Sequence, residues 1–385
     1  MKKTTKQSIV LYSILAVLSA IFLLLGNTLF AQSQTAASEL YRAKVISVDN
    51  ISFSFTDYAE ETIVNETVAF TAKIVSGKWR GEIITATQYV DNIYPDTPNA
   101  VEAGSNVILN HTDIGGDSAE FIFSQYNRIS PILVLFLFFS ALLLIIAKKS
   151  GISIIVSLII TGLAIFSVYL PAILSGANIY VTTIVIALFI TVVSLIFVGG
   201  FKIKSLAAII GTTGGVILSG LLAVIFSKIL AITGMLNEDY FFLVFLLEGK
   251  PLDLRAVVWS GIVIGSLGAV MDVAMSISSA MNEVAENIKE PAINNLFRIG
   301  MNIGRDAIGT MTNTLVLAYI GSSLATILLL TAYNNDPLYI LNLETIVAEI
   351  MQAIVGSIGI LFAVPVTAMI SSFLFQDRKQ ASNTI

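Results

Sequence analysis

Hydrophobic residues are arranged along most of the chain in long runs separated by short polar connections. A helix needs about 20 apolar residues to cross the roughly 30 Å hydrocarbon core of a bilayer. Runs of that length predict eight transmembrane helices, at residues 8–30, 129–147, 151–173, 179–199, 205–232, 255–281, 306–331 and 347–374. The pattern therefore predicts an α-helical polytopic membrane protein.

One long polar stretch, residues 32–127, follows a different pattern. Its apolar residues alternate with period two in short segments rich in Val, Ile, Thr and aromatics, and turn residues at 76–78, 96–98 and 115–117 separate these segments. This predicts a small all-β domain of five or six antiparallel strands, either a barrel, which could be of the OB type, or a sandwich. The predicted organisation is a cytoplasmic tip and anchor helix (1–31), the β domain (32–127), a seven-helix transmembrane domain (128–376) and a cytoplasmic tail (377–385).

Basic residues occur in every second connection between the predicted helices, which orients the chain by the positive-inside rule. These residues are Lys2, Lys3, Lys6, Lys148, Lys149, Lys202, Lys204, Lys289, Arg298, Arg305, Arg378 and Lys379. Both termini are therefore expected in the cytoplasm of a bacterium and the β domain outside its plasma membrane. The first apolar run could also be a cleaved signal peptide, but its length of about 20 residues favours a retained anchor.

Composition narrows the possible functions. Hydrophobic residues make up 56% of the chain and charged residues only 12%, against about 25% charged in soluble proteins. The absence of cysteine and the single histidine, His111, argue against disulfides, cysteine-based metal centres and multi-histidine sites. We expect no metal, no cofactor and, at a net charge of −5, no nucleic-acid partner. The chain also lacks Ser-His and HExxH arrangements, so we expect that it is not an enzyme, and a membrane-embedded hydrolase is the third choice.

The sixth predicted span carries an intramembrane acid, Asp272, about 25 Å from its outer end at 1.5 Å per residue. Intramembrane charges are costly and usually face a bundle interior or a wet cavity. Small and polar residues share its helical face through spacings of three and four: Gly261, Gly265, Gly268, Ser276 and Ser279. Because small residues permit close helix approach, this stripe predicts tight packing against a partner helix, for which the next span is the best candidate.

The seventh predicted span begins with a second polar face. Asp306, Thr310, Asn313 and Thr314 follow spacings of four, seven and eight, and the residues Asn302, Arg305, Gly309 and Thr312 lie beside them. Asp272 and Asp306 are expected at similar depth, which would place two carboxylates, one arginine and several hydroxyl and amide groups in one site. Alternatively, Asp272 pairs with Arg305, Asp306 lies in the headgroup zone, and the Thr and Asn side chains form hydrogen bonds between helices.

Two segments, GAVMDVAMSISSAMNE (268–283) and GMNIGRDAIGTMTNTLVLAYIG (300–321), resemble the YibE/F-like membrane protein family. The anchor helix and external β domain are similar to its larger, YibE-like member, which implies a smaller partner that has the helices only. The order of external domain, acidic helix and Thr-rich helix also looks like SecF-type proton-driven permeases, although this chain has two additional spans.

These patterns favour a secondary transporter or transporter subunit, coupled to protons or another cation. Its candidate coupling and substrate residues are Asp272, Asp306, Arg305, Ser276, Asn302, Thr310 and Asn313, and its candidate helix-packing residues are Gly261, Gly265, Gly268 and Gly309. The expected partners are the lipid bilayer and either further copies of the chain or the smaller family member. The alternative is a non-transporting assembly or accessory protein whose β domain binds a partner.

Overall fold

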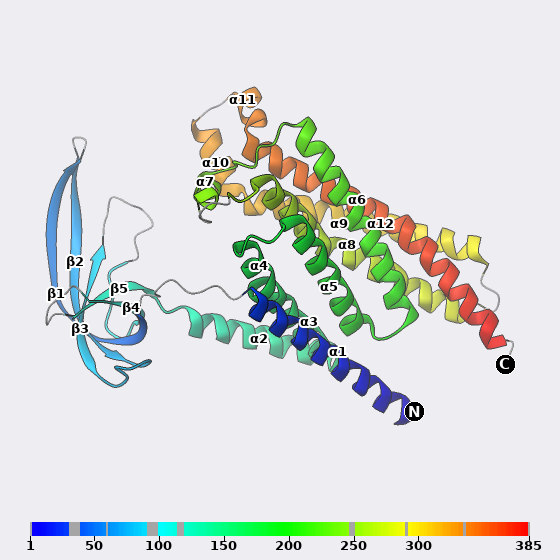
Figure 1. Cartoon of the computed structure of the whole chain (residues 1–385), viewed down its shortest axis with the longest axis horizontal. Coiled ribbons are helices and arrows are strands. Elements are labelled where there is room, and N and C mark those ends of the chain that lie inside the picture. Colours follow the sequence, from blue (N-terminus) through cyan, green and yellow to red (C-terminus); the bar gives the residue numbers. More distant parts are fainter. Residues whose placement is uncertain are drawn as a thin grey trace. The chain divides into compact units, whose positions relative to one another are not determined.

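The computed structural model describes residues 2–30, 39–58, 61–90, 99–113, 119–245, 251–288, 292–333 and 336–383. Two compact units divide the chain (Figure 1). One comprises residues 33–146, and the other comprises residues 1–32 together with 147–385. The predicted turns at 96–98 and 115–117 and the basic residue Lys289 lie outside the described residues.

The first unit contains a closed five-stranded barrel with strand order β1-β2-β3-β5-β4. The strands are β1 (Glu39–Tyr58), β2 (Glu61–Ile74), β3 (Ile83–Val90), β4 (Asn106–Asp113) and β5 (Ala119–Tyr126). All neighbours are antiparallel except β3 and β5, whose parallel pairing helps to close the barrel. This confirms the predicted barrel, and its Greek-key order is of the OB type.

Alternation along the strands explains the barrel core. On β2, Val68, Phe70, Ala72 and Ile74 are spaced by two residues and are fully buried, because successive side chains of a strand point to opposite faces. The same unit includes helix α2 (Ile129–Ala147), one of the predicted spans. The sequence had grouped α2 with the other helices in a seven-helix transmembrane domain, which stays a prediction.

The second unit is entirely helical. Its elements are α1 (Lys2–Leu29), α3 (Lys149–Ala164), the π-helical turn η1 (Ile165–Tyr169), α4 (Leu170–Leu174), α5 (Ile179–Gly199), α6 (Ile203–Ile229), α7 (Glu238–Phe245), α8 (Leu254–Asn287), α9 (Ile293–Ser322), α10 (Leu324–Tyr333), α11 (Pro337–Asn342) and α12 (Glu344–Asn383). In the described chain, seven helices are long and apolar enough to span a membrane, α3, η1 and α4 together making one of them. Helices α9 and α10, bent by 60° at their junction, pass the same test only as a pair, so the described chain has seven or eight candidate spans.

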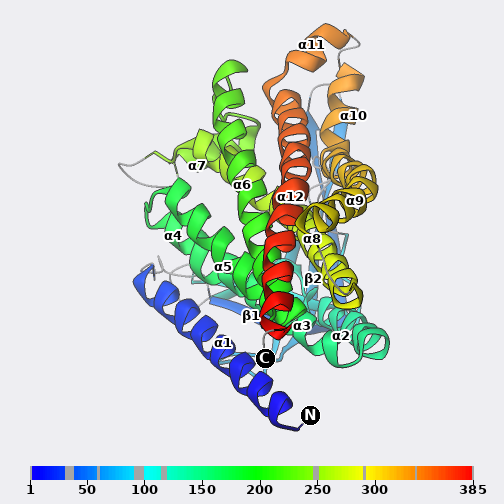
Figure 2. The same ribbon diagram turned by 90° about the vertical axis from the view of Figure 1, so that its right-hand side faces the viewer.

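The centre of this unit is the contact of α6, α8 and α12, which run side by side with α9 against them (Figure 2). Glycines bring α6 and α12 close together. A Cβ on Gly215 would lie 2.7 Å from the carbonyl oxygen of Gly359, and a Cβ on Gly211 would overlap the side chain of Thr367. One turn further, Ser219 Oγ donates to the carbonyl oxygen of Val355 at 3.3 Å. Helix α8 is consequently held between neighbours on one side and presents its other side outward.

Candidate functional site

Helix α8 positions Asp272, the predicted intramembrane acid. The helix starts at an N-cap in which Asp253 Oδ1 accepts a hydrogen bond from the backbone N–H of Ala256 at 3.2 Å. It then continues without interruption to Asn287, beyond the predicted end at residue 281. Its buried side chains follow helical spacing on one face, and they include Ile262, Leu267, Val270, Val273, Ala274, Ile277 and Met281.

The predicted small-residue stripe lies on the opposite face of α8, and most of it is exposed among the described residues. Its exposed residues are Gly261, Gly265, Gly268, Asp272 and Ser276. A Cβ on Gly261 or Gly268 would meet nothing within 4 Å among the described residues, whereas one on Gly265 would meet the Tyr319 hydroxyl at 2.7 Å. The stripe thus meets the next helix at Gly265, as expected, whereas Gly261 and Gly268 have no close neighbour among the described residues.

Helix α9 shows the same division into a packed apolar face and an exposed polar face. Its packed face includes Leu296, Gly300, Gly304 and Leu315. A Cβ on Gly304 would lie 3.2 Å from Ile277 Cδ1 of α8 and closer still to Val364 of α12, and Gly300 lies against Met281 and Ala368. The glycines that bring α9 close to its neighbours are thus Gly300 and Gly304, which the sequence interpretation did not select.

All the candidate residues of α9 lie on its exposed face, which comprises Asn302, Arg305, Asp306, Gly309, Thr310 and Asn313. Nothing in the described chain lies within 4 Å of a Cβ on Gly309. A packing role for Gly261, Gly268 and Gly309 therefore remains a prediction that requires a second chain.

The contacts between α8 and α9 fix the relative depth of the two acids. Gly304 lies beside Ile277 and Gly300 beside Met281, so the helices are antiparallel. Asp272, five residues before Ile277, is therefore level with Gly309. Asp306 is three residues from Gly309, which makes the axial offset of the two carboxylates about 5 Å at 1.5 Å per residue. The two acids are therefore at similar heights along the antiparallel helix pair, and their depth in a membrane stays a prediction.

Charged groups on these faces have no ionic partner within the described chain. Neither Asp272 nor Asp306 forms an ion pair with Arg305 or any other described residue, so the alternative of an Asp272–Arg305 pair is not observed. Two threonine hydroxyls bond within their own helix: Thr310 Oγ1 donates to the carbonyl oxygen of Ala307, and Thr314 Oγ1 to that of Thr310. Hydrogen bonds between helices are therefore not the role of these two hydroxyls.

A lysine side chain, that of Lys204, lies at one end of the small-residue stripe of α8. The Nζ of Lys204, at the start of α6, donates to Ser279 Oγ at 3.3 Å, while Ser278 Oγ donates to the Lys204 carbonyl oxygen at 2.7 Å. Ser279 is two helical turns beyond Asp272 on the same face, about 10 Å along the axis. Lys204 is a member of this site that the sequence had assigned only to a basic loop.

One further polar group of α9, Tyr319, was missed by the sequence interpretation, which had placed Thr312 beside the polar face. The hydroxyl of Thr312 is buried and has no hydrogen-bond partner among the described residues, and the buried hydroxyl of Tyr319 interacts with the side chain of Gln352. A Cβ on Gly265 would lie between the Tyr319 hydroxyl at 2.7 Å and Gln352 Nε2, from α12, at 3.2 Å. The spacing of seven between Thr312 and Tyr319 places them on one helical face and was a usable signal.

Comparison with known proteins gives one match. A family model described as YibE/F-like protein matches residues 135–377, which is more than half of the chain. No curated protein and no solved structure matches the chain.

Proposed function

The chain belongs to the YibE/F-like protein family, and on that premise we propose that it is a secondary transporter or transporter subunit, coupled to protons or another cation through the carboxylates of α8 and α9. The resemblance of residues 268–283 and 300–321 to this family is thereby confirmed. In this proposal the protein has no catalytic activity of its own.

The observation that carries the proposal is the pair of uncovered polar faces on two membrane-type helices. Asp272, Arg305 and Asp306 are exposed and without ion pairs in the described chain. Charged groups at this depth are costly against lipid and are usually found in bundle interiors or water-filled cavities. A water-filled pathway along these faces satisfies that requirement.

The chemistry follows from the response of a carboxyl group to water. Desolvation disfavours the charged form, and hydration restores it. An arrangement of the helices that admits water to Asp272 therefore favours proton release, and one that excludes water favours proton uptake. Protonation can in this way bias which arrangement is populated. Asp306, offset by about 5 Å along the helices, is the accessory acid.

Orientation and partners complete the proposal. The alternating basic connections support cytoplasmic termini, an extracytoplasmic barrel and a bacterial plasma membrane. The uncovered glycines Gly261, Gly268 and Gly309 support assembly with further copies or with a smaller, YibF-like member, because each leaves room for another helix to approach.

Proton exchange by the purified chain tests the function. We expect the wild-type protein to release protons on alkalinisation through neutral pH, where ordinary carboxyl groups are already ionised, in an amount that Asp272→Asn reduces and Asp306→Asn changes less. Glu238→Gln, which removes an acid from α7 outside the candidate site, is the matched control. A titration that is the same for Asp272→Asn and for Glu238→Gln contradicts coupling through Asp272.

The alternative function, a non-transporting assembly or accessory protein, has its own supporting observation. The barrel exposes several large apolar side chains, namely Leu40, Ile46, Ile51, Phe53, Val75, Ile83 and Tyr89. Exposed apolar surface on a small domain is typical of binding sites for other proteins. In this case Asp272 is a contact residue, and Asp272→Asn weakens assembly without altering proton exchange.

A further inference from the structure

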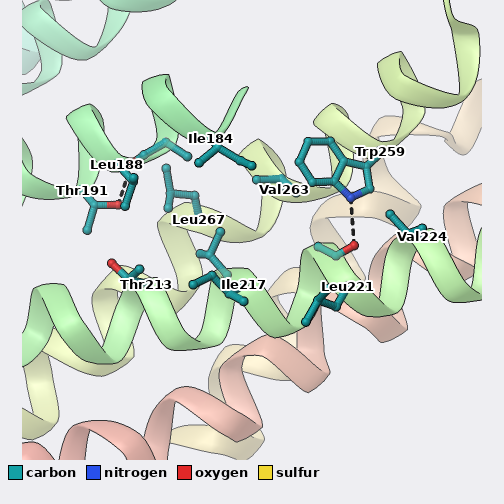
Figure 3. A pocket seen from close by; sticks show the side chains of 13 residues that line it. Ile184, Leu188, Thr191, Thr213, Ile217, Leu221, Val224, Trp259, Val263 and Leu267 are labelled. Atoms are coloured by element: carbon teal, nitrogen blue, oxygen red, sulfur yellow. Dashed lines mark hydrogen bonds between the residues drawn. The ribbon is translucent and has the colours of Figure 1, made fainter. Parts of the chain in front are cut away.

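An apolar cavity of about 330 Å³ lies between α5, α6 and α8 (Figure 3). Its lining consists of Ile184, Ala187, Leu188, Thr191, Thr213, Val216, Ile217, Gly220, Leu221, Val224, Trp259, Val263 and Leu267. Ile184, Ile217 and Leu221 are each at least half exposed. The cavity thus lies beside surface that the surrounding lipid covers in a membrane, away from the polar faces of α8 and α9.

The walls of this cavity offer no free hydrogen-bonding side chain. Trp259 Nε1 donates to the carbonyl oxygen of Gly220 at 2.8 Å, as Figure 3 shows. Thr191 Oγ1 donates to the Ala187 carbonyl oxygen at 2.7 Å, and Thr213 Oγ1 to that of Ile209 at 2.8 Å. Because every lining polar side chain already has a partner, the cavity is suited to an aliphatic chain.

The length of the cavity matches one leaflet of a bilayer. Along α6 the lining extends over twelve residues, from Thr213 to Val224, which is about 17 Å at 1.5 Å per residue. Half of the roughly 30 Å hydrocarbon thickness is about 15 Å. An acyl chain that reaches from the headgroup level to the middle of the membrane therefore fits along this wall.

A second, polar cavity of about 210 Å³ adjoins the first and shares Val224 and Trp259 with it. Its other lining residues are Tyr180, Ser227, Lys228, Asp253 and Arg255. Lys228 and Arg255 are exposed and form no ion pair with any residue that the structure describes. Asp253 is the only acid in this lining, and its Oδ1 caps α8. The lining therefore has one more positive than negative charge at the headgroup end of the apolar cavity.

We propose that the two cavities together bind one anionic phospholipid of the surrounding bilayer, with an acyl chain along α6 and the phosphate group beside Lys228 and Arg255. Burial of the chain supplies the apolar contribution. Basic residues at the ends of membrane helices attract anionic headgroups, and this makes the site selective for charge. The proposal does not depend on the transport function, since none of these residues belongs to the candidate coupling site.

Trp259 makes the proposal measurable. The chain has two tryptophans, so Trp79→Phe leaves Trp259 as the single emitter, and its side chain is only 7% exposed. The purified full chain in nanodiscs of phosphatidylcholine receives increasing fractions of phosphatidylglycerol brominated midway along its chains. We expect Trp259 quenching to saturate at a lower fraction than with brominated phosphatidylcholine. Equal dependence on the two lipids contradicts the proposal.

Charge and cavity variants locate the lipid. Lys228→Gln and Arg255→Gln should each raise the half-maximal phosphatidylglycerol fraction about fivefold. Lys202→Gln, at the opposite end of α6, is the matched control and should leave it unchanged. Ile217→Phe fills the apolar cavity and should reduce quenching by either lipid. Unchanged quenching in Ile217→Phe, or an equal shift in Lys202→Gln, overturns the site; both cations are exposed, so their replacement costs little stability.

Discussion

Replacing single glycines of α9 by alanine gives a direct measure of which face of this helix is packed. Gly304 lies against Val364 and Ile277, whereas Gly309, five residues further on, has nothing within 4 Å of a Cβ among the described residues. Both positions are in the interior of the same helix. Alanine therefore gains the same helix propensity at each, about 1 kcal/mol, and only the contact with neighbouring helices differs.

The expected magnitude follows from the overlap at Gly304. Forcing an additional carbon into a well-packed contact costs about 1–3 kcal/mol. Gly304→Ala should thus be less stable than Gly309→Ala by about 1–3 kcal/mol, which is about a 5- to 150-fold difference in the ratio of folded to unfolded protein. Gly309→Ala itself should be neutral or up to about 1 kcal/mol more stable than wild type.

The assay is denaturant unfolding of the purified chain in mixed micelles, followed through Trp259 in a Trp79→Phe background. Trp259 is in the buried core of the helical unit and reports its unfolding. Equal stability of the two variants would refute the packing described for α9. A loss of stability confined to Gly309→Ala would indicate that the polar face, rather than the Gly304 face, makes the dominant contact.

Three further predictions concern the barrel and the orientation of the chain. Hydrogen bonds from Tyr41 and Lys78 hold the pKa of the Glu39 carboxyl below its ordinary value of 4.5. Their stabilising contribution is therefore present above pH 4.5 and is lost as the pH falls through the lowered pKa. Glu39→Gln should reduce the fall of the barrel melting temperature at acid pH, measured by Trp79 emission. Gly77→Ala should destabilise the barrel more than Gly104→Ala in the same thermal melts. Both glycines have positive φ, 83° and 90°, which costs a residue with a Cβ about 1–2 kcal/mol. Only at Gly77 does the added Cβ also meet a side chain, that of Tyr41 at 2.7 Å. Because the chain has no cysteine, Ser105→Cys in the barrel should react with an impermeant thiol reagent from outside intact cells and Lys202→Cys only after lysis, and the reverse pattern would invert the topology.

Periodicity was sufficient to predict most of the fold. Seven of the eight apolar runs correspond to single candidate spans and the eighth falls on the bent pair α9 and α10. Alternation with period two predicted the barrel, because burial in lipid and burial in a barrel core leave different repeats in the sequence. The bend between α9 and α10 was not predicted: the whole stretch from residue 306 to 331 is apolar enough to span, and hydropathy carries no information on direction.

The candidate site was predicted in part. Helical spacing correctly placed Asp272 with Gly265, Gly268 and Ser276 on one face of α8. It could not show that Gly261 and Gly268 have no neighbour within the described chain while Gly265 contacts Tyr319, because small residues alone do not name the helix that approaches them. The contact formed instead through Gly300 and Gly304, whose neighbours Ile277, Met281 and Val364 are distant in sequence.

Water access to the polar faces of α8 and α9 in the membrane tests the central claim most directly. Single variants Ser276→Cys and Thr310→Cys place a thiol on these faces, and Ala274→Cys, at a fully buried position of α8, is the control. A thiol reacts as the thiolate, which requires water. The account predicts that the first two react with a small hydrophilic reagent in membranes and that Ala274→Cys does not. Failure of both Ser276→Cys and Thr310→Cys to react would contradict a water-filled pathway and leave these faces as dry contacts with another protein.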